Sequence, residues 1–327
     1  MTEKSFVHLH NHSEFSFIDG SSLLDSMASI CNNLGMPAIA LTDHGNMYGA
    51  IDFYNACKTK NIKPIIGCEF YIAPKSRFDK DPSYSYDHLT VIAKNNLGYS
   101  NLIKLVSKGN LEGFYYRPRI DKEILKEHSE GLIVLSGCPS AELFKKIVSG
   151  DEKSIMDTID WYKEVFGDDY YLEIMRHEHV DNQEKVNQWI INNYKQLNVK
   201  IVATNDNHYE TKDDYEKEIL LKNVRSGSSN PRSDILEDNS YYIASPEEMR
   251  EKFKDVPEAC DNTLEIADKC NIEIDFSGTM IPEFKTPENK DSFSYLKELC
   301  LEGLSKKFPE PSKEITDRLN YELSVIQ

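Results

Sequence analysis

The chain has 327 residues, with 38 lysines and arginines against 55 aspartates and glutamates, so its formal net charge at pH 7 is −17. That acidity disfavours broad binding to duplex nucleic acid, which depends on basic side chains, although metal ions could supply positive charge at a local site. No apolar run approaches the ~18 residues of a membrane span, and MTEKSF lacks the apolar core of a secretory signal. Seven cysteines without a CxxC pair favour reduced thiols and a cytoplasmic location.

Short apolar runs rich in β-branched residues predict seven strands along the first two thirds of the chain. They are Phe6–His10, Ala38–Thr42, Pro64–Ile72, Leu89–Ala93, Leu132–Ser136, Tyr170–Met175 and Lys200–Thr204. Apolar residues with helical spacing lie between many of them, as from Leu23 to Leu34. This alternation predicts a parallel sheet with helices on its faces. Seven units in roughly 210 residues favour a barrel, with a doubly wound open sheet as the alternative.

The character of the sequence changes after about Ser277, where TMIPEFKTPENKD is polar and rich in proline, as linkers are. Two helices are expected after it, Phe293–Leu304 and Ile315–Ile326. The second reaches Gln327 without a stop signal, so we expect the natural chain to continue. The expected domains are a barrel over residues 1–276, then a linker and the start of a further region over 277–327.

Side chains that bind metals recur at the ends of the predicted strands. His8 and His10 share one face of the first strand, as paired ligands should, and His12 would share it only if that strand continued. The other strands end near residues with imidazole, carboxylate or thiol groups: His44, Glu69, Cys138, Asp206 and His208. Because the carboxyl ends of parallel barrel strands converge on one mouth, these groups predict a metal centre there.

Several long motifs resemble a known family. They are HLHNHSEFSFIDG (8–20), GMPAIALTDHGNMYGAIDFY (35–54), IKPIIGCEFYIA (62–73), HLTVIAKNNLGYSNL (88–102), GFYYRPRID (113–121), EGLIVLSGCPSAEL (130–143) and VATNDNHY (202–209). The sequence is similar to the polymerase and histidinol phosphatase (PHP) domain, in the form found at the N-terminus of bacterial DNA polymerase III alpha subunits. The similarity covers essentially the whole chain.

The resemblance implies a distorted (β/α)7 TIM-like barrel with up to three divalent metal ions. The nine ligands that it implies are His8, His10, Asp19, His44, Glu69, His88, Cys138, Asp206 and His208. His12 is then expected to support the ligands without binding metal. Mixed nitrogen, oxygen and sulfur ligands suit zinc, with manganese or iron as alternatives. Bound ions would give an otherwise anionic site the positive charge that a phosphate requires.

The expected activity is metal-dependent phosphoester hydrolysis. The resemblance implies a 3′–5′ exonuclease acting on the single-stranded 3′ end of DNA, within a subunit whose polymerase active site lies outside this chain. We expect His10, His44, Asp206 and His208 to act at the reacting centre. Phosphate contacts are expected from basic residues on loops at the mouth, beside tyrosines that can stack on bases: Arg77, Arg117, Arg119 and Arg176.

Other functions remain open at this point. The domain could be structural, stabilising the polymerase and holding a separate proofreading partner. It could be a pyrophosphatase or a free-standing small-molecule phosphatase. The expected partners are DNA, the remainder of the alpha subunit and other replisome subunits, with no membrane.

Overall fold

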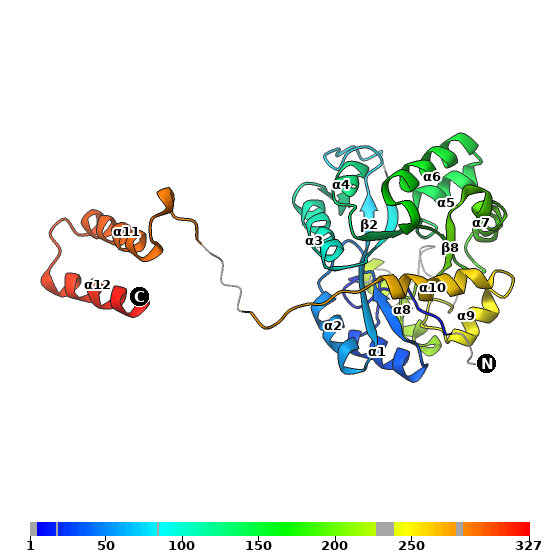
Figure 1. The fold of residues 1–327 in the computed structure, drawn as a ribbon, viewed down its shortest axis with the longest axis horizontal. Coiled ribbons are helices and arrows are strands. Elements are labelled where there is room, and N and C mark those ends of the chain that lie inside the picture. The colour runs from blue at the N-terminus through cyan, green and yellow to red at the C-terminus, as the bar shows by residue number, and fades with distance from the viewer. Residues whose placement is uncertain (1–4, 18, 84, 227–238, 279–283) are drawn as a thin grey trace. The chain divides into compact units, whose positions relative to one another are not determined.

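The computed structural model describes residues 5–17, 19–83, 85–226, 239–278 and 284–327. The chain divides into two compact units, Met1–Ile274 and Asp275–Gln327 (Figure 1). Within the described residues, no helix is both long enough and apolar enough to cross a membrane. The seven cysteines are all free.

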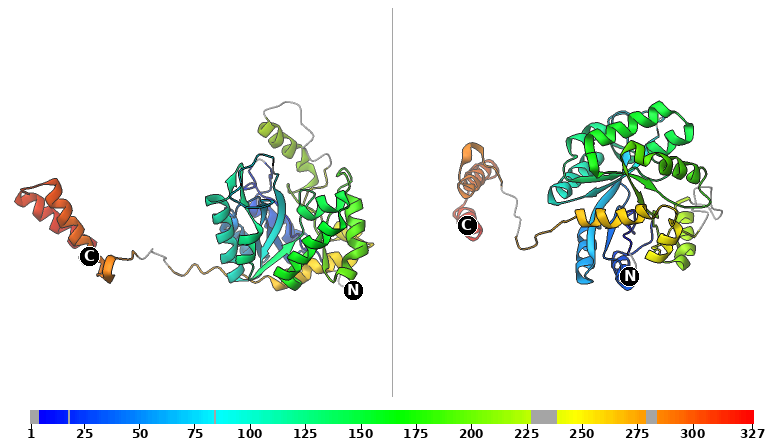
Figure 2. Two further views of the ribbon diagram at one scale, coloured as in Figure 1. Left: turned by 90° about the horizontal axis from the view of Figure 1, so that it is seen from above. Right: turned by 45° about the vertical axis from the view of Figure 1, so that its right-hand side comes forward.

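The first unit is built around a curled sheet, with helices packed against its outer side (Figure 2). Its strands, within the described residues, are β1 (Ala38–Leu41), β2 (Lys63–Ile72), β3 (Asp87–Ala93), β4 (Phe114–Tyr115), β5 (Arg117–Ile120), β6 (Leu132–Leu135), β7 (Tyr170–Ile174) and β8 (Lys200–Ala203). Their order is β4-β5-β2-β3-β6-β7-β8, and β1 pairs with the first half of β2.

Ten helices of this unit follow or connect these strands in the described part of the chain. They are α1 (Leu24–Asn33), α2 (Ala50–Thr59), α3 (Asn96–Leu111), α4 (Lys122–Glu127), α5 (Glu142–Ser149), α6 (Glu152–Phe166), α7 (Gln183–Leu197), α8 (Tyr215–Ser226), α9 (Pro246–Lys252) and α10 (Pro257–Lys269). The predicted strands other than Phe6–His10 correspond to β1, β2, β3, β6, β7 and β8 within two residues.

The sheet is not wholly parallel, which corrects the sequence prediction. β3 runs antiparallel to both of its neighbours, β2 and β6. The reason is the connection: residues 73–86 contain no α-helix among those described. A return without a crossover helix reverses the chain direction. The hairpin of β4 and β5, which we expected to be a loop, adds to the second half of β2.

The predicted first strand, Phe6–His10, is not a regular strand, but this N-terminal segment lies between β1 and the end of β8 and joins them. The amide of Ala40 donates to the carbonyl of His8 (2.9 Å), and that of Asn207 donates to the carbonyl of His10 (3.1 Å). The amide of His12 donates in turn to the carbonyl of Asn207 (2.7 Å). The segment therefore lies between β1 and the end of β8, and the fold is a distorted TIM-like barrel.

Alternate residues of the strands face two separate hydrophobic clusters. In β1, Ala38 and Ala40 belong to the inner cluster, and Ile39 and Leu41 belong to the outer cluster under the helices. The N-terminal segment alternates in the same way: Val7 and Leu9 are inner, and Phe6 is outer. This period of two explains why buried strands read as continuous apolar runs.

Glu142 of α5 provides a test of the packing between helices. Its carboxylate accepts from Lys122 of α4 (2.9 Å) and from Lys146 (2.6 Å). Burial alone would raise the pKa of Glu142, but the two ammonium groups hold it below its usual range. A carboxylate with a lowered pKa stabilises the fold above its unfolded pKa, and that contribution is lost as pH falls through the folded value.

Glu142→Gln is therefore expected to lower the free energy of unfolding by about 1–2 kcal/mol at pH 7. The difference from wild type should shrink as pH falls below the ordinary glutamate range, which urea denaturation at several pH values will measure. Glu164→Gln, which breaks an exposed pair with Lys126, serves as the control and should change stability far less, because solvent screens that pair. A pH-independent effect of Glu142→Gln would contradict the account.

The second unit contains α11 (Ser292–Lys307) and α12 (Lys313–Ile326). Their N-caps are Asp291 and Ser312, whose side chains accept from the amides of Ser294 and Ile315. The two predicted helices are confirmed, with three of their four bounds extended by one to three residues and the end at Ile326 unchanged. Residues 279–283 of the predicted linker lie outside the described residues.

Candidate metal centre

A cluster of imidazole, carboxylate and thiol groups gathers at the mouth of the barrel. Glu69, near the end of β2, lies at the middle of this cluster and is 1% exposed. Glu69 Oε1 lies 3.3 Å from His10 Nε2 and 3.1 Å from His88 Nδ1, and Oε2 lies 2.6 Å from His44 Nδ1. The thiol of Cys138 lies 3.3 Å from the same Oε1. One carboxylate thus contacts side chains from four other parts of the chain.

Asp206 is the second carboxylate of the cluster. Its Oδ1 lies 3.3 Å from His10 Nε2 and 3.2 Å from His12 Nε2. Three groups have ligand atoms within 4.8 Å of one another and could each hold a metal ion: His12–His44–His208, His10–His12–Glu69 and His44–Glu69–His88. Because the groups share members, the geometry suits a multinuclear centre. We call nine residues the mouth cluster: His10, His12, Asp19, His44, Glu69, His88, Cys138, Asp206 and His208.

The hydrogen bonding of the cluster is incomplete in a way that fits metal binding. Five buried atoms, from different members, make no hydrogen bond of acceptable geometry despite the short distances given above: His10 Nε2, His12 Nε2, His44 Nδ1, Glu69 Oε2 and Asp206 Oδ1. Buried polar atoms are normally paired, and unpaired ones indicate a missing water or ion. These atoms belong to the residue types that bind divalent metals, so the residues present fit the ions that the family implies.

Hydrogen bonds at Nδ1, the ring nitrogen that does not face the cluster, orient three of the histidines. His10 Nδ1 lies 2.8 Å from Glu173 Oε1, and His208 Nδ1 lies 2.7 Å from the carbonyl of Asp206. His12 Nδ1 lies 2.9 Å from the hydroxyl of Ser16, which donates to Asp43 (2.7 Å). Acceptors at Nδ1 select the tautomer whose Nε2 carries a free lone pair, and that nitrogen can face a metal.

The electrostatics show how strongly the cluster demands positive charge. Burial would raise the pKa of Glu69, yet His88, His44 and His10 hold it well below its usual range. Burial would lower the pKa of His10, yet Asp206, Glu173 and Glu69 raise it well above the ordinary value. Burial and the neighbouring His44 and His208 lower the pKa of His12 to about 3. Without metal, an imidazolium thus carries the charge that a divalent ion would supply.

Most of the predicted ligands come together. Asp19 joins at the edge, where its Oδ2 lies 3.7 Å from His44 Nε2. His88 joins because β3 is antiparallel, which brings the start of β3 to the mouth where the parallel strands end. The thiol of Cys138 lies 3.5 Å from His88 Nδ1. Burial and the carboxylate of Glu69 raise the pKa of this thiol well above its ordinary value, so a metal would be needed to deprotonate it.

The structure places His12 in the mouth cluster and His8 outside it, the reverse of the arrangement that we expected. His8 Nε2 lies 2.8 Å from the carbonyl of Ala244, and Nδ1 lies 2.9 Å from the side-chain amide of Asn207. Both ring nitrogens of His8 are therefore occupied outside the mouth cluster, because His8 faces away from the inner side where Val7 and Leu9 pack. The chain bends at His10, and His12 enters the cluster in place of His8.

Two of the four predicted phosphate contacts serve the fold instead. The guanidinium of Arg77, which is 8% exposed, pairs with Asp121 (3.1 Å) and Glu112 (2.6 Å). Arg119, 2% exposed, donates to the backbone carbonyls of Gly113, Arg77 and Asp79. Neither is available to a substrate. Sequence alone does not reveal that the acidic partners lie within reach.

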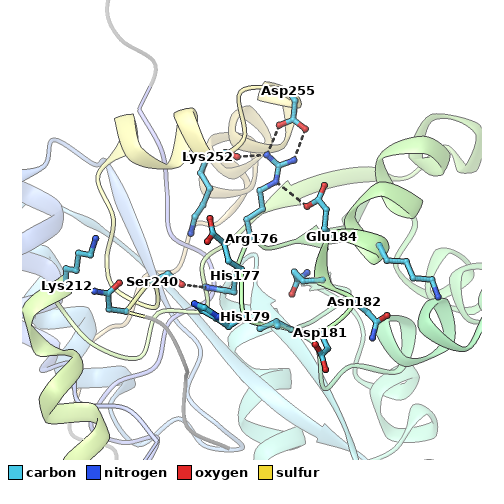
Figure 3. A pocket seen from close by; sticks show the side chains of 15 residues that line it. Arg176, His177, His179, Asp181, Asn182, Glu184, Lys212, Ser240, Lys252 and Asp255 are labelled. Atoms are coloured by element: carbon cyan, nitrogen blue, oxygen red, sulfur yellow. Dashed lines mark hydrogen bonds and ion pairs between the residues drawn. The ribbon is translucent and has the colours of Figure 1, made fainter. Parts of the chain in front are cut away.

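Arg117 and Arg176 have different surroundings. Arg117 lies over the ring of Tyr71 (5.6 Å), which packs 5.2 Å from the ring of His88. Arg117 thus lies beside the mouth cluster. Arg176 makes a bidentate pair with Asp255 (2.7 Å twice) at the edge of a pocket of about 1130 Å³ (Figure 3). That pair joins Arg176, which follows β7, to the connection between α9 and α10.

Sequence reasoning missed two charged residues next to the cluster. Glu173 contacts His10 and follows Tyr171 by two positions, so an acidic residue on the inner face of a buried strand was its available signal. Lys222 of α8, 8% exposed, lies 3.3 Å from Asp19 and 3.7 Å from the buried Glu218. Helical spacing gave no sign that Lys222 would reach the mouth.

A distorted TIM-like barrel whose mouth gathers histidines, carboxylates and a cysteine has the fold and the side chains of a metal-binding barrel protein. The sequence comparisons identify its family. The PHP domain family model matches residues 8–177, so the chain belongs to the PHP domain family. It is 42% identical over 329 residues to the DNA polymerase III subunit alpha of Borreliella burgdorferi and 40% identical over 333 residues to that of Treponema pallidum. These alignments cover 98% and 100% of this chain.

The same alignments cover 28% of each relative, so the chain spans less than a third of their length. Among solved structures, it is similar to a protein from Bifidobacterium adolescentis that is assigned provisionally as a metal-dependent phosphoesterase. That pair has 13% identity and a TM-score of 0.41, and covers 75% of this chain and 96% of the other.

Proposed function

We propose that this chain is the metal-dependent phosphoesterase domain of a DNA polymerase III alpha subunit and acts as a 3′–5′ exonuclease on single-stranded DNA. The observation that carries the proposal is the mouth cluster, with three overlapping groups of candidate ligands and five buried polar atoms without partners. The relatives named above support its place in a polymerase subunit. Residues 275–327 would then lead into the rest of that subunit.

The residues of the mouth cluster have definite roles in this proposal. Divalent ions held by the nine residues would activate a water molecule and stabilise the charge on the attacked phosphate. Glu69 and Asp206 each face two or more histidines, so both carboxylates would help to hold the ions. His10, His12 and His208 present Nε2 to the same centre, with Nδ1 occupied. Their fixed tautomers keep the site organised before substrate arrives.

Substrate contacts would come from the rim of the mouth. Arg117 is the candidate that remains of the four predicted arginines, because its neighbour Tyr71 packs against His44 and His88. Lys222 is a further candidate, since its ammonium group lies at the edge marked by Asp19. Both cations would pair with phosphates of a single strand whose terminal phosphodiester lies over the cluster.

The proposal predicts metal-dependent shortening of DNA. With added zinc or manganese, 5′-labelled single-stranded DNA should shorten one nucleotide at a time, and a 3′ label should be released at once as a mononucleotide. His12→Asn should reduce the rate by about 100-fold or more. His128→Gln, a histidine at the end of α4 outside the cluster, should not change it.

Two outcomes would count against this function. Cleavage that persists in His12→Asn would point to a contaminating nuclease. Absence of cleavage in wild type with metal bound would favour a structural role that holds a proofreading partner. Pyrophosphate hydrolysis under the same conditions would identify a pyrophosphatase instead.

A further inference from the structure

Glu173 is not a member of the mouth cluster, yet it contacts one member, His10, and also Gly137, the residue before another member, Cys138. It is in β7, faces inward and has a fully buried side chain. Its Oε1 lies 2.8 Å from His10 Nδ1 and accepts from the hydroxyl of Thr204 (2.7 Å). Its Oε2 accepts from the amide of Gly137 (2.9 Å). The two oxygens therefore face two different segments of the chain.

The contact with Gly137 fixes the loop that carries the cysteine. Gly137 has a φ of +93°, and a Cβ there would meet the Cβ of Ala141 at 2.8 Å, so the turn requires glycine. This backbone conformation aims the amide at Glu173 and places Cys138 next in the chain. The thiol of Cys138 then lies beside Glu69 and His88.

We propose that Glu173 is a positioning residue that holds His10 and the Cys138 loop in place together, and so couples two sides of the metal centre. This rests on the metal centre of the proposed function, but not on its substrate. Carboxylates that accept from a ligand histidine orient its ring and increase its basicity. Glu173 adds to that role the placement of a thiol from another strand.

A carboxylate suits this position better than an amide. Each oxygen of Glu173 accepts a hydrogen bond on a different side. A glutamine has one acceptor oxygen, and its NH2 group would face a donor on the other side. Glu173→Gln preserves shape and size while it breaks one of the two anchors. The unpaired buried donor that remains would move either His10 or the loop of Cys138.

The test is a cobalt titration of metal-free protein, without any DNA. Co²⁺ reports total affinity through its visible absorption, and a thiolate-to-cobalt charge-transfer band reports ligation by Cys138. Glu173→Gln should weaken Co²⁺ binding by about 10- to 100-fold and reduce the charge-transfer band per bound ion. Thr204→Val, which removes one donor to Glu173, should weaken binding by a smaller factor without changing any member of the cluster.

Glu142→Gln is the matched control, because it removes a partly buried charge from a glutamate elsewhere in the barrel. It should lose stability but keep the affinity for Co²⁺ and the charge-transfer band. Equal losses in Glu142→Gln and Glu173→Gln would assign the effect to stability and overturn the proposal, as would wild-type binding by Glu173→Gln. Wild-type protein that binds Co²⁺ but does not cleave DNA would reject the exonuclease alone. Wild-type protein that binds no Co²⁺ would reject both.

Discussion

Glu69→Gln is expected to abolish metal-dependent cleavage, with a loss of about 100-fold or more, and to remove more than one bound ion per chain. The physical reason is that Glu69 is shared. Its two oxygens contact His10, His44 and His88, and the thiol of Cys138 lies against the same carboxylate. Glutamine offers one acceptor oxygen and no charge, so it would hold divalent ions far less strongly than the carboxylate does. Elemental analysis of the purified protein and a cleavage time course measure the two effects.

The control for this prediction is Glu164→Gln, an exposed glutamate paired with Lys126. It should retain the metal content and cleavage rate of wild type. Glu69→Gln with undiminished metal content and wild-type cleavage would show that the ions lie elsewhere. A loss of cleavage with all metal retained would restrict Glu69 to catalysis and contradict its role in holding the ions.

Removing the metals with a chelator is expected to lower the melting temperature by about 8 °C. Ligands that bind only the folded state stabilise it by about 4 kcal/mol at a free concentration of 1,000 times Kd. A change of 1 kcal/mol shifts the melting temperature of a protein this large by roughly 2 °C. The ions would bind the folded state alone, because the mouth cluster brings together side chains such as His10, Glu69 and Asp206 that are far apart in the chain.

Differential scanning calorimetry with and without chelator measures this shift. Glu69→Gln should melt at one temperature under both conditions, because it has lost the site that the ions stabilise. A shift of the same size in Glu69→Gln would mean that the metals act outside the mouth cluster. No shift in wild type would contradict tight metal binding at this site.

The sequence predicted the architecture of the site better than its details. Residues that follow apolar runs come together at the mouth as expected, because the carboxyl ends of parallel strands converge. His44 lies against Glu69, and Asp206 lies against His10. His88 could not be placed by that rule. His88 is near the start of β3, and it lies at the mouth only because β3 runs antiparallel to β2. The sequence of the connection between β2 and β3 does not predict that direction.

The exchange of His8 and His12 shows the limit of counting alternate residues. Alternation correctly groups His8 with His10 in an ideal strand. The inner packing of Val7 and Leu9 instead turns His8 toward the helices, and the bend at His10 brings in His12. Arg77 and Arg119 were assigned to phosphate because basic loops near a mouth are typical of such contacts. Their internal partners are distant in sequence, and therefore only the folded structure reveals them.

The most direct test of the metal centre is anomalous diffraction from crystals of the chain grown with zinc or manganese, measured at the absorption edge of the metal. We predict two or three peaks within bonding distance of the mouth cluster, with His12 Nε2 and Glu69 among the ligands and His8 still hydrogen-bonded to the carbonyl of Ala244. Crystals whose protein binds metal elsewhere but shows no peak in the mouth cluster would contradict the account. So would a metal bound by His8 and not by His12.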